Sequence, residues 1–214
     1  MATIDQYYQP VRYPDQSLSR IFYTRTIAPT TEPLTLDDAV RHLQLSVCGD
    51  TAYVINLIQV ARDVAENATG LVLSPATWRG VFESWPQCGR RVSLSMSPIT
   101  AVSSVKYYPE DGGALVTVSA ADYTVSTDVT PAVITFGEDF TSPALANRPD
   151  AIQVNFTAGY ASATVVPPSV KHALRILVRH YYDHPEAVAS GSFEELPFGL
   201  RHLLTSNRVY GWTA

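Results

Sequence analysis

The hydrophobic period of this sequence changes twice, and this constrains the fold more than any other feature. Apolar residues recur at helical spacing from about residue 35 to 69, alternate from about 71 to 160, and return to helical spacing after 168. Terminal helices with one apolar stripe each must bury those stripes against one another. The pattern therefore predicts an α+β fold, in which a small helical bundle formed by the N- and C-terminal helices carries an inserted antiparallel β-sheet or small β-barrel.

Start and stop signals support four helices. Thr35 is a good N-cap, and Asp37 and Asp38 follow it in the first turn, where carboxylates suit the positive end of the helix dipole. Gly70 has the residue type that ends a helix in the left-handed conformation. The pair Pro167-Pro168 marks a helix start, because proline is tolerated in the first turn. The expected helices begin at residue 35 and continue with 51–69, 169–182 and 198–205.

The central segment reads as short strands separated by turns. Asp111-Gly112-Gly113 lies between two alternating runs and predicts a hairpin. Short strands at this spacing favour an antiparallel arrangement over a parallel α/β sheet. The expected strands are 77–84, 91–95, 102–108, 115–119, 123–126, 132–136 and 151–160.

Residues 1–33 follow neither period. They mix aromatic side chains with prolines, which exclude long regular elements. Two interpretations stay open: an arm that packs on another molecule, or a tail that lies on its own domain. The expected organisation is an extended arm at 1–33, a bundle at 34–73 and 167–184, a β domain at 74–166, and a flexible linker with a C-terminal docking helix and tail at 185–214.

The charge balance excludes some classes of function. The chain has 214 residues with 20 acidic and 15 basic side chains, a formal net charge of −5. A protein that coats nucleic acid needs a basic face, so this class is disfavoured. Cys48 and Cys88 are far apart and form no metal-ligand spacing, which argues against a disulfide framework. The first residues contain no signal-peptide pattern and no apolar run reaches the ~18 residues of a membrane span, so we expect a soluble protein made in a cytoplasm, with no membrane partner.

The acidity is concentrated in one stretch. Between Pro109 and Asp150 there are seven acidic residues and one base, Arg148, which gives −6. The remaining 13 acids and 14 bases give +1. Such a stretch serves solubility or repels phosphate. Apart from Asp150, its acidic residues are Glu110, Asp111, Asp122, Asp128, Glu138 and Asp139.

The search for catalytic chemistry yields one weak candidate. His180 and His184 are spaced i, i+4, as zinc ligands on a helix are, with Asp183 beside them. The zincin pattern needs Glu directly after the first His, and Tyr181 stands there. Nucleophile elbows and phosphate-binding loops are also absent from the sequence. We therefore expect that the chain is not an enzyme and that it has no metal site and no cofactor. A metal-dependent hydrolase is kept as a remote alternative.

A basic stripe follows the third expected helix. Lys171, Arg175 and Arg179 are spaced i, i+4, i+8. The favoured interpretation is the solvent face of an amphipathic helix, and the alternative is a docking face for an acidic partner.

Several stretches, taken in order, carry a family resemblance over about residues 32 to 210. They are Glu32-Pro33-Leu34-Thr35-Leu36-Asp37-Asp38-Ala39, the run 61–70 ending Ala68-Thr69-Gly70, Thr77-Trp78, the run 98–108 beginning Pro98-Ile99-Thr100-Ala101, Val154-Asn155-Phe156-Thr157-Ala158-Gly159-Tyr160, Val166-Pro167-Pro168-Ser169-Val170-Lys171, His180-Tyr181-Tyr182 and Glu195-Leu196-Pro197-Phe198-Gly199. With them the chain resembles the head–tail connector (adaptor, or head-completion) proteins of long-tailed bacteriophages and gene-transfer agents.

The resemblance implies a structural, non-enzymatic role in the virion neck. It implies a homo-oligomeric ring, commonly of twelve subunits, between the portal protein and a stopper or tail-completion protein, with DNA passing through without sequence-specific binding. We hypothesise that part of the 109–150 stretch, with its acidic residues Glu110, Asp111, Asp122, Asp128, Glu138 and Asp139, faces this channel or its mouth. The C-terminal segment would dock on the portal through Phe198, Leu200, Leu203, Tyr210 and Trp212, unless these side chains cap the chain's own core. The alternative within virions is another tail-completion or baseplate protein.

Overall fold

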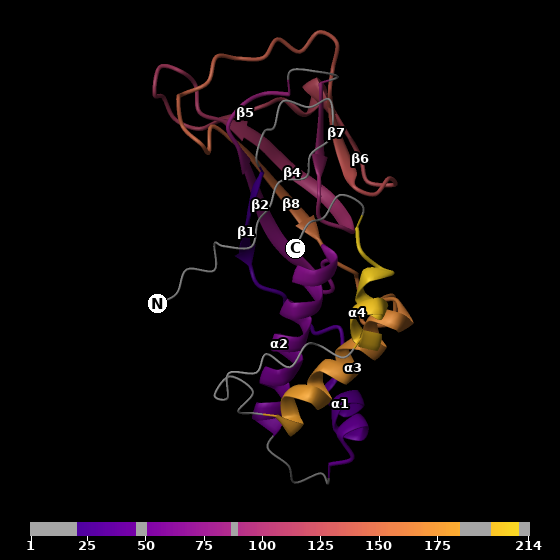
Figure 1. Ribbon diagram of the computed structural model, residues 1–214. Coiled ribbons are helices and arrows are strands. Elements are labelled where there is room, and N and C mark those ends of the chain that lie inside the picture. The colour runs from indigo at the N-terminus through magenta and orange to yellow at the C-terminus, as the bar shows by residue number, and fades with distance from the viewer. Residues whose placement is uncertain (1–20, 46–50, 87–89, 185–197, 210–214) are drawn as a thin grey trace.

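The computed structural model describes residues 21–45, 51–86, 90–184 and 198–209 (Figure 1). Within these ranges the helices are α1 (Leu36–Leu43), α2 (Thr51–Thr69), the 3-10 turn η1 (Ala120–Asp122), α3 (Pro168–Asp183) and α4 (Phe198–Thr205). The strands are β1 (Phe22–Ile27), β2 (Ala76–Phe82), β3 (Arg91–Leu94), β4 (Ile99–Tyr107), β5 (Val116–Thr117), β6 (Tyr123–Ser126), β7 (Ala132–Phe136) and β8 (Ile152–Ala158).

The four helices form one bundle with a shared apolar core. The Thr35 hydroxyl accepts a hydrogen bond from the Asp38 N–H at 3.1 Å, which confirms the predicted N-cap of α1. Gly70 follows α2 with φ +73°, the left-handed conformation predicted for it. Side chains from all four helices meet in the core, among them Leu43, Ile58, Leu174 and Leu200. In the part of the chain that is described, no helix has the length and apolarity to cross a bilayer.

The described strands form two antiparallel sheets, and neither of these sheets closes into a barrel. One sheet has the order β1-β2-β8-β4-β5, and the other has the order β3-β7-β6. A second apolar core lies between them, centred on Trp85, whose ring makes edge contacts with Tyr107, Phe136 and Phe140. The α+β prediction is confirmed. Of the two predicted forms of the β part, an antiparallel sheet or a small barrel, the structure shows sheets.

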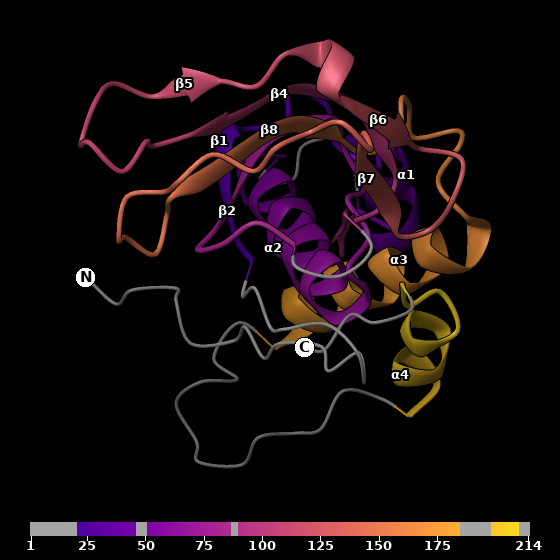
Figure 2. The same ribbon diagram turned by 90° about the horizontal axis from the view of Figure 1, so that it is seen from above.

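The helices lie at one end of the molecule and the sheets at the other, as Figure 1 shows, and Figure 2 gives the view from above, from the end of the sheets. Backbone bonds join the two parts where the chain passes between them. Gly70 accepts a hydrogen bond from the Ser97 N–H at 3.2 Å, and Ser97 accepts one from the Val72 N–H at 2.7 Å. Gly159, which directly follows β8, donates its N–H to the Pro98 carbonyl at 2.8 Å. We call residues 70–75, 97–98 and 158–159 the junction.

The sequence analysis expected no strand before residue 77, and β1 shows that this is wrong. β1 pairs antiparallel with β2, from Phe22 opposite Val81 to Ile27 opposite Thr77. The stretch between Pro14 and Pro29 is long enough for a six-residue strand at a sheet edge, where proline nearby does no harm. These residues of the predicted arm therefore lie on the chain's own sheet, while residues 1–20 fall outside the described ranges.

Candidate functional site

The acidic residues of the 109–150 stretch lie in three separate places. Glu110 and Asp111 are exposed in the β4–β5 turn. Asp122 lies beside the end of β7, because its carbonyl accepts the Gly137 N–H at 2.8 Å, and Glu138 and Asp139 follow there. Asp128 is exposed in the β6–β7 turn, at the other end of that hairpin.

The loop 141–150 is fastened to the β4–β5 turn. Pro109 and Leu145 form an isolated bridge, and Tyr108 accepts the Ala146 N–H at 3.0 Å. The Arg148 guanidinium lies 3.8 Å over the Tyr108 ring and bonds both carboxylate oxygens of Asp150 at 2.5 and 2.7 Å. This ion pair holds the pKa of Asp150 below its usual range.

Most of the acidic charge of this stretch is unpaired within the described residues. Arg148 neutralises Asp150. None of the other six carboxylates makes an ion pair with a residue in the described ranges. Five of the six are exposed, and Asp122 is half-buried.

Two of the predicted docking residues lie in the bundle. Leu200 is 1% exposed in the core of the bundle, and Leu203 packs partly buried against it. The N–H of Val209, which is also buried, donates to the Thr69 carbonyl at 2.8 Å, which ties the end of the segment to α2. Tyr210 and Trp212 lie outside the described residues, and so does the side chain of Phe198. For Leu200 and Leu203 the structure matches the alternative interpretation, in which they cap the chain's own core.

The charged residues of α3 are largely engaged within the bundle. Arg179 donates to Asp183 at 2.6 Å and to the Leu43 carbonyl at 3.3 Å, which caps the C-terminal end of α1. Arg175 approaches Asp38 at 3.9 Å. These contacts favour the predicted amphipathic face over a free basic stripe.

The same contacts weaken the candidate metal site. The Asp183 carboxylate is occupied by Arg179, and the ring of His184 lies with its Nδ1 3.1 Å from the His180 carbonyl. Among the residues that the structure describes, no three His, Cys, Asp or Glu side chains gather as metal ligands would.

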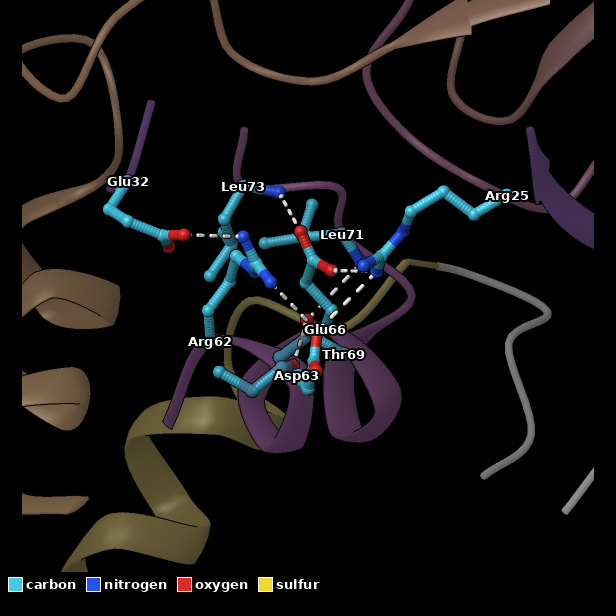
Figure 3. A network of polar contacts seen from close by, with 9 residues as sticks. Arg25, Glu32, Arg62, Asp63, Glu66, Thr69, Leu71 and Leu73 are labelled. Carbon is cyan, nitrogen blue, oxygen red and sulfur yellow. Dashed lines mark hydrogen bonds and ion pairs between the residues drawn. The ribbon is translucent and has the colours of Figure 1, made fainter. Parts of the chain in front are cut away.

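A buried polar cluster beside the junction was missed by the sequence analysis (Figure 3). The Glu66 carboxylate accepts the Leu73 N–H at 2.7 Å and the Arg25 guanidinium at 3.0 Å. One turn earlier on α2, Arg62 donates to Glu32 at 2.8 Å. Asp63 lies within 3.5 Å of both arginines. We call Arg25, Glu32, Arg62, Asp63 and Glu66 the polar cluster.

The polar cluster connects α2 to the strand β1 and to the segment that follows it. Arg25 comes from β1, lies 4.9 Å over the Trp78 ring of β2 and reaches α2. Glu32 lies in the segment between β1 and α1, and its bond to Arg62 attaches this segment to α2. The signal in the sequence was the placement of Arg62 and Glu66 on the stripe of α2 that also carries Ile58, Ala61 and Ala65, because charged side chains on a buried face need partners.

Burial dominates the electrostatics of Glu66. Removal from water raises the pKa of Glu66 to about 7, although the Leu73 N–H and the two arginines favour the charged form. The pKa of Glu32 is raised as well, because its burial outweighs the attraction of Arg62.

The pKa of Glu66 predicts a pH-dependent stability. Between pH 4.5 and 7 the unfolded chain loses the proton of Glu66 while the folded protein keeps it, so this group stabilises the fold fully below pH 4.5 and progressively less up to pH 7. The loss amounts to about 3 kcal/mol. The variant Glu66→Gln has no such proton, so its stability relative to the native protein should rise by that amount between pH 4.5 and 7.5, as measured by urea unfolding. A difference in unfolding free energy between the two proteins that stays constant over this pH range would contradict the raised pKa of Glu66.

Comparison with known proteins gives matches in structure only. No family model matches the sequence, and no curated protein matches it. A chain in the virion of a native gene transfer agent (GTA) particle superposes with a TM-score of 0.71 at 20% identity. A chain in the neck of an empty GTA particle, computed with C6 symmetry, gives a TM-score of 0.70 at 20% sequence identity. A chain in the neck of a native GTA particle, computed with C12 symmetry, gives a TM-score of 0.67 at 19% sequence identity. Each alignment covers 88% of this chain and 95% of the other. The fold implied by the sequence resemblance is therefore confirmed.

Proposed function

We propose that this chain is a non-enzymatic structural protein of a virion neck, made in the cytoplasm of a bacterial host. In this proposal it is a head–tail adaptor that forms a ring, of about twelve copies, between the portal and a stopper or tail-completion protein, and DNA passes through the ring. The observation that carries the proposal is the match in fold to GTA neck chains over 88% of this chain and 95% of theirs. Near-complete coverage on both sides means that the whole architecture is shared, not one common module.

The experiment is assembly of this chain with a portal protein from the same source. Mass photometry and electron microscopy of the chain, alone and with portal, should show a ring with cyclic symmetry on the portal. The portal is included because an isolated adaptor subunit can stay monomeric until it binds the portal. Absence of a ring under both conditions would contradict the adaptor proposal and favour a tail-completion or baseplate role.

The unpaired acidic residues suggest how DNA passes. A wall of carboxylates repels phosphate, so DNA would slide without being held. We place Glu110, Asp111, Asp122, Asp128, Glu138 and Asp139 toward the channel or its mouth. None of them forms an ion pair with a described residue, which supports this placement. A map of the ring that shows all six only on the outer rim would refute this placement.

The C-terminal segment is proposed to dock on the portal. Removing everything after Pro197 is a poor test, because Leu200, Leu204 and Val209 belong to the bundle core and their loss would unfold it. The variant Tyr210→Ala/Trp212→Ala changes none of these three core residues and removes two aromatic residues of the kind that carry interface energy. It should keep the native unfolding temperature and weaken portal capture in a pull-down by about tenfold or more. Undiminished capture would contradict docking through these residues.

A further inference from the structure

The segment that leads from β1 to α1 has little apolar attachment. Of residues 26–31, Pro29 is half-buried and the others are exposed, with Ile27 at 62%. None of them contributes to either apolar core of the described chain. We call residues 26–31 the strap, because they cross from the sheets to the helical bundle. Segments with few buried apolar contacts open at a low cost in free energy, so the residues at the two ends decide how firmly the strap is attached.

Both ends of the strap bind α2 through the polar cluster. Arg25, directly before the strap, donates to the Glu66 carboxylate at 3.0 Å. Glu32, directly after it, accepts a hydrogen bond from Arg62 at 2.8 Å. Figure 3 shows Arg25 and Glu32 reaching this part of α2 from opposite sides. The polar cluster therefore holds the strap on α2 at both of its ends.

The charges of the polar cluster do not balance. Its three carboxylates face two guanidinium groups, so the cluster has a net charge of −1 when every group is ionised. The side chains of Glu66 and Arg62 are only 10% and 6% exposed. In addition, Arg25 Nε, Arg62 Nε and Glu32 Oε2 are buried without a hydrogen-bond partner among the described residues. An uncompensated buried charge is costly, so one bound proton on a carboxylate balances the cluster.

Glu66 is the carboxylate best placed to hold this proton. The groups that face it are Arg25 of β1, Arg62 and Asp63 of α2 and the Leu73 N–H, and the junction contains no charged residue. Burial outweighs the two arginines and raises the pKa of Glu66 to about 7. Arg25 covers the Oε2 atom of Glu66, so its departure opens the carboxylate to water. The pKa of Glu66 then returns toward its ordinary value of 4.5.

We propose that the polar cluster is a pH-sensitive switch for the strap: with one proton bound it holds the strap on α2, and after losing that proton it lets the strap detach more readily. The sign follows from linkage, because the detached state, in which the carboxylate is in water, binds the proton more weakly than the attached state. The strap joins the sheets to the bundle, so the switch controls one of the connections between these two parts. The inference does not depend on the proposed function, because the attachment of the strap is a property of a single chain.

The test is hydrogen exchange of single amides, followed by NMR at pH 5.5 and 7.5 and corrected for the chemical exchange rate. The reporters are Ile27 in the strap, which pairs with Thr77, and Leu73, whose N–H bonds Glu66. A return of the Glu66 pKa from about 7 to 4.5 on opening predicts that the open fraction rises about twentyfold between these two pH values. Both reporters should also exchange faster than Ile134 in β7, which opens only with the whole fold.

Three variants assign the pH response to Glu66. Glu66→Gln has no proton to lose, so its open fraction should be the same at both pH values. Asp63→Asn removes a half-exposed carboxylate that raises the pKa of Glu66, so it should give a smaller rise, and it keeps the test decisive where Glu66→Gln does not fold. Asp37→Asn, on the exposed face of α1, is the matched control and should keep the full rise.

Two results would overturn the inference. One is a full twentyfold rise that persists in Glu66→Gln or in Asp63→Asn, because the response would then belong to another group. The other is exchange of Ile27 and Leu73 only at the rate of Ile134, because the strap would then open only when the whole fold does. Neither result bears on whether the chain forms a ring, so the proposed function is judged separately.

Discussion

Replacing Gly159 by alanine is expected to destabilise the fold by about 4 kcal/mol. Gly159 has φ +123°, a conformation that side-chain-bearing residues rarely adopt. A Cβ there would lie 2.3 Å from the Ser74 carbonyl oxygen and 2.8 Å from the Pro75 Cα, so the backbone of the junction would have to move. Backbone strain of ~1–2 kcal/mol and overpacking of ~1–3 kcal/mol add to the expected loss. Urea unfolding of the variant measures it.

Two other glycines are matched controls for this substitution. Gly112 also has a positive φ, +74°, but a Cβ would meet nothing within 4 Å, so Gly112→Ala should lose only the strain of about 1 kcal/mol. Gly137 has ordinary φ, and a Cβ would lie 3.6 Å from the nearest carbonyl oxygen, so Gly137→Ala should be close to neutral. A loss at Gly159 no larger than that at Gly112 would mean that the junction yields easily.

A stiff junction matters for the proposed ring. It connects the sheets to the helical bundle. Copies in a closed ring must all hold the same angle between these two parts. The close approach of Gly159 to Ser74 and the bonds of Ser97 to residues 70 and 72 provide this fixed angle.

Helices were predictable from local signals, and tertiary pairing was not. The N-cap of Thr35 and the left-handed Gly70 act within one helix turn, so the residue types alone indicate the helix ends. β1 was missed because a strand at a sheet edge is selected by its partner β2, and its residues Phe22–Ile27 show no strict alternation.

For the candidate surfaces too, residue types and composition could be predicted from the sequence, and their arrangement in space could not. The acidity of 109–150 is a property of composition and could be counted, but its division among three places depends on which strand ends meet, as at Asp122 and Gly137. Leu200 has the residue type of an interface anchor and equally that of a core residue, and only packing against the bundle decides between them.

Replacing Arg62 by methionine is expected to cost about 4 kcal/mol, because it removes one partner of a buried ion pair and leaves the other in place. Arg62 has a side chain only 6% exposed and bonds Glu32 at 2.8 Å and Asp63 at 3.3 Å. Methionine keeps the apolar length of the side chain, so the loss reports the charge and not a cavity. The free energy of unfolding by urea at pH 7.5, where Glu66 is largely ionised, is the measurement.

The double variant Arg62→Met/Glu32→Gln distinguishes an ion pair from general packing. If the cost comes from the stranded carboxylate, neutralising Glu32 should restore about 1 kcal/mol or more. Arg41→Met is the matched control, because Arg41 pairs with Asp37 on an exposed turn of α1 and its loss should be unmeasurable. Additive single effects, or an equal loss at Arg41, would show that the polar cluster does not hold β1 and the following segment on α2. Coupling would instead show that this segment is positioned by charge from within the fold.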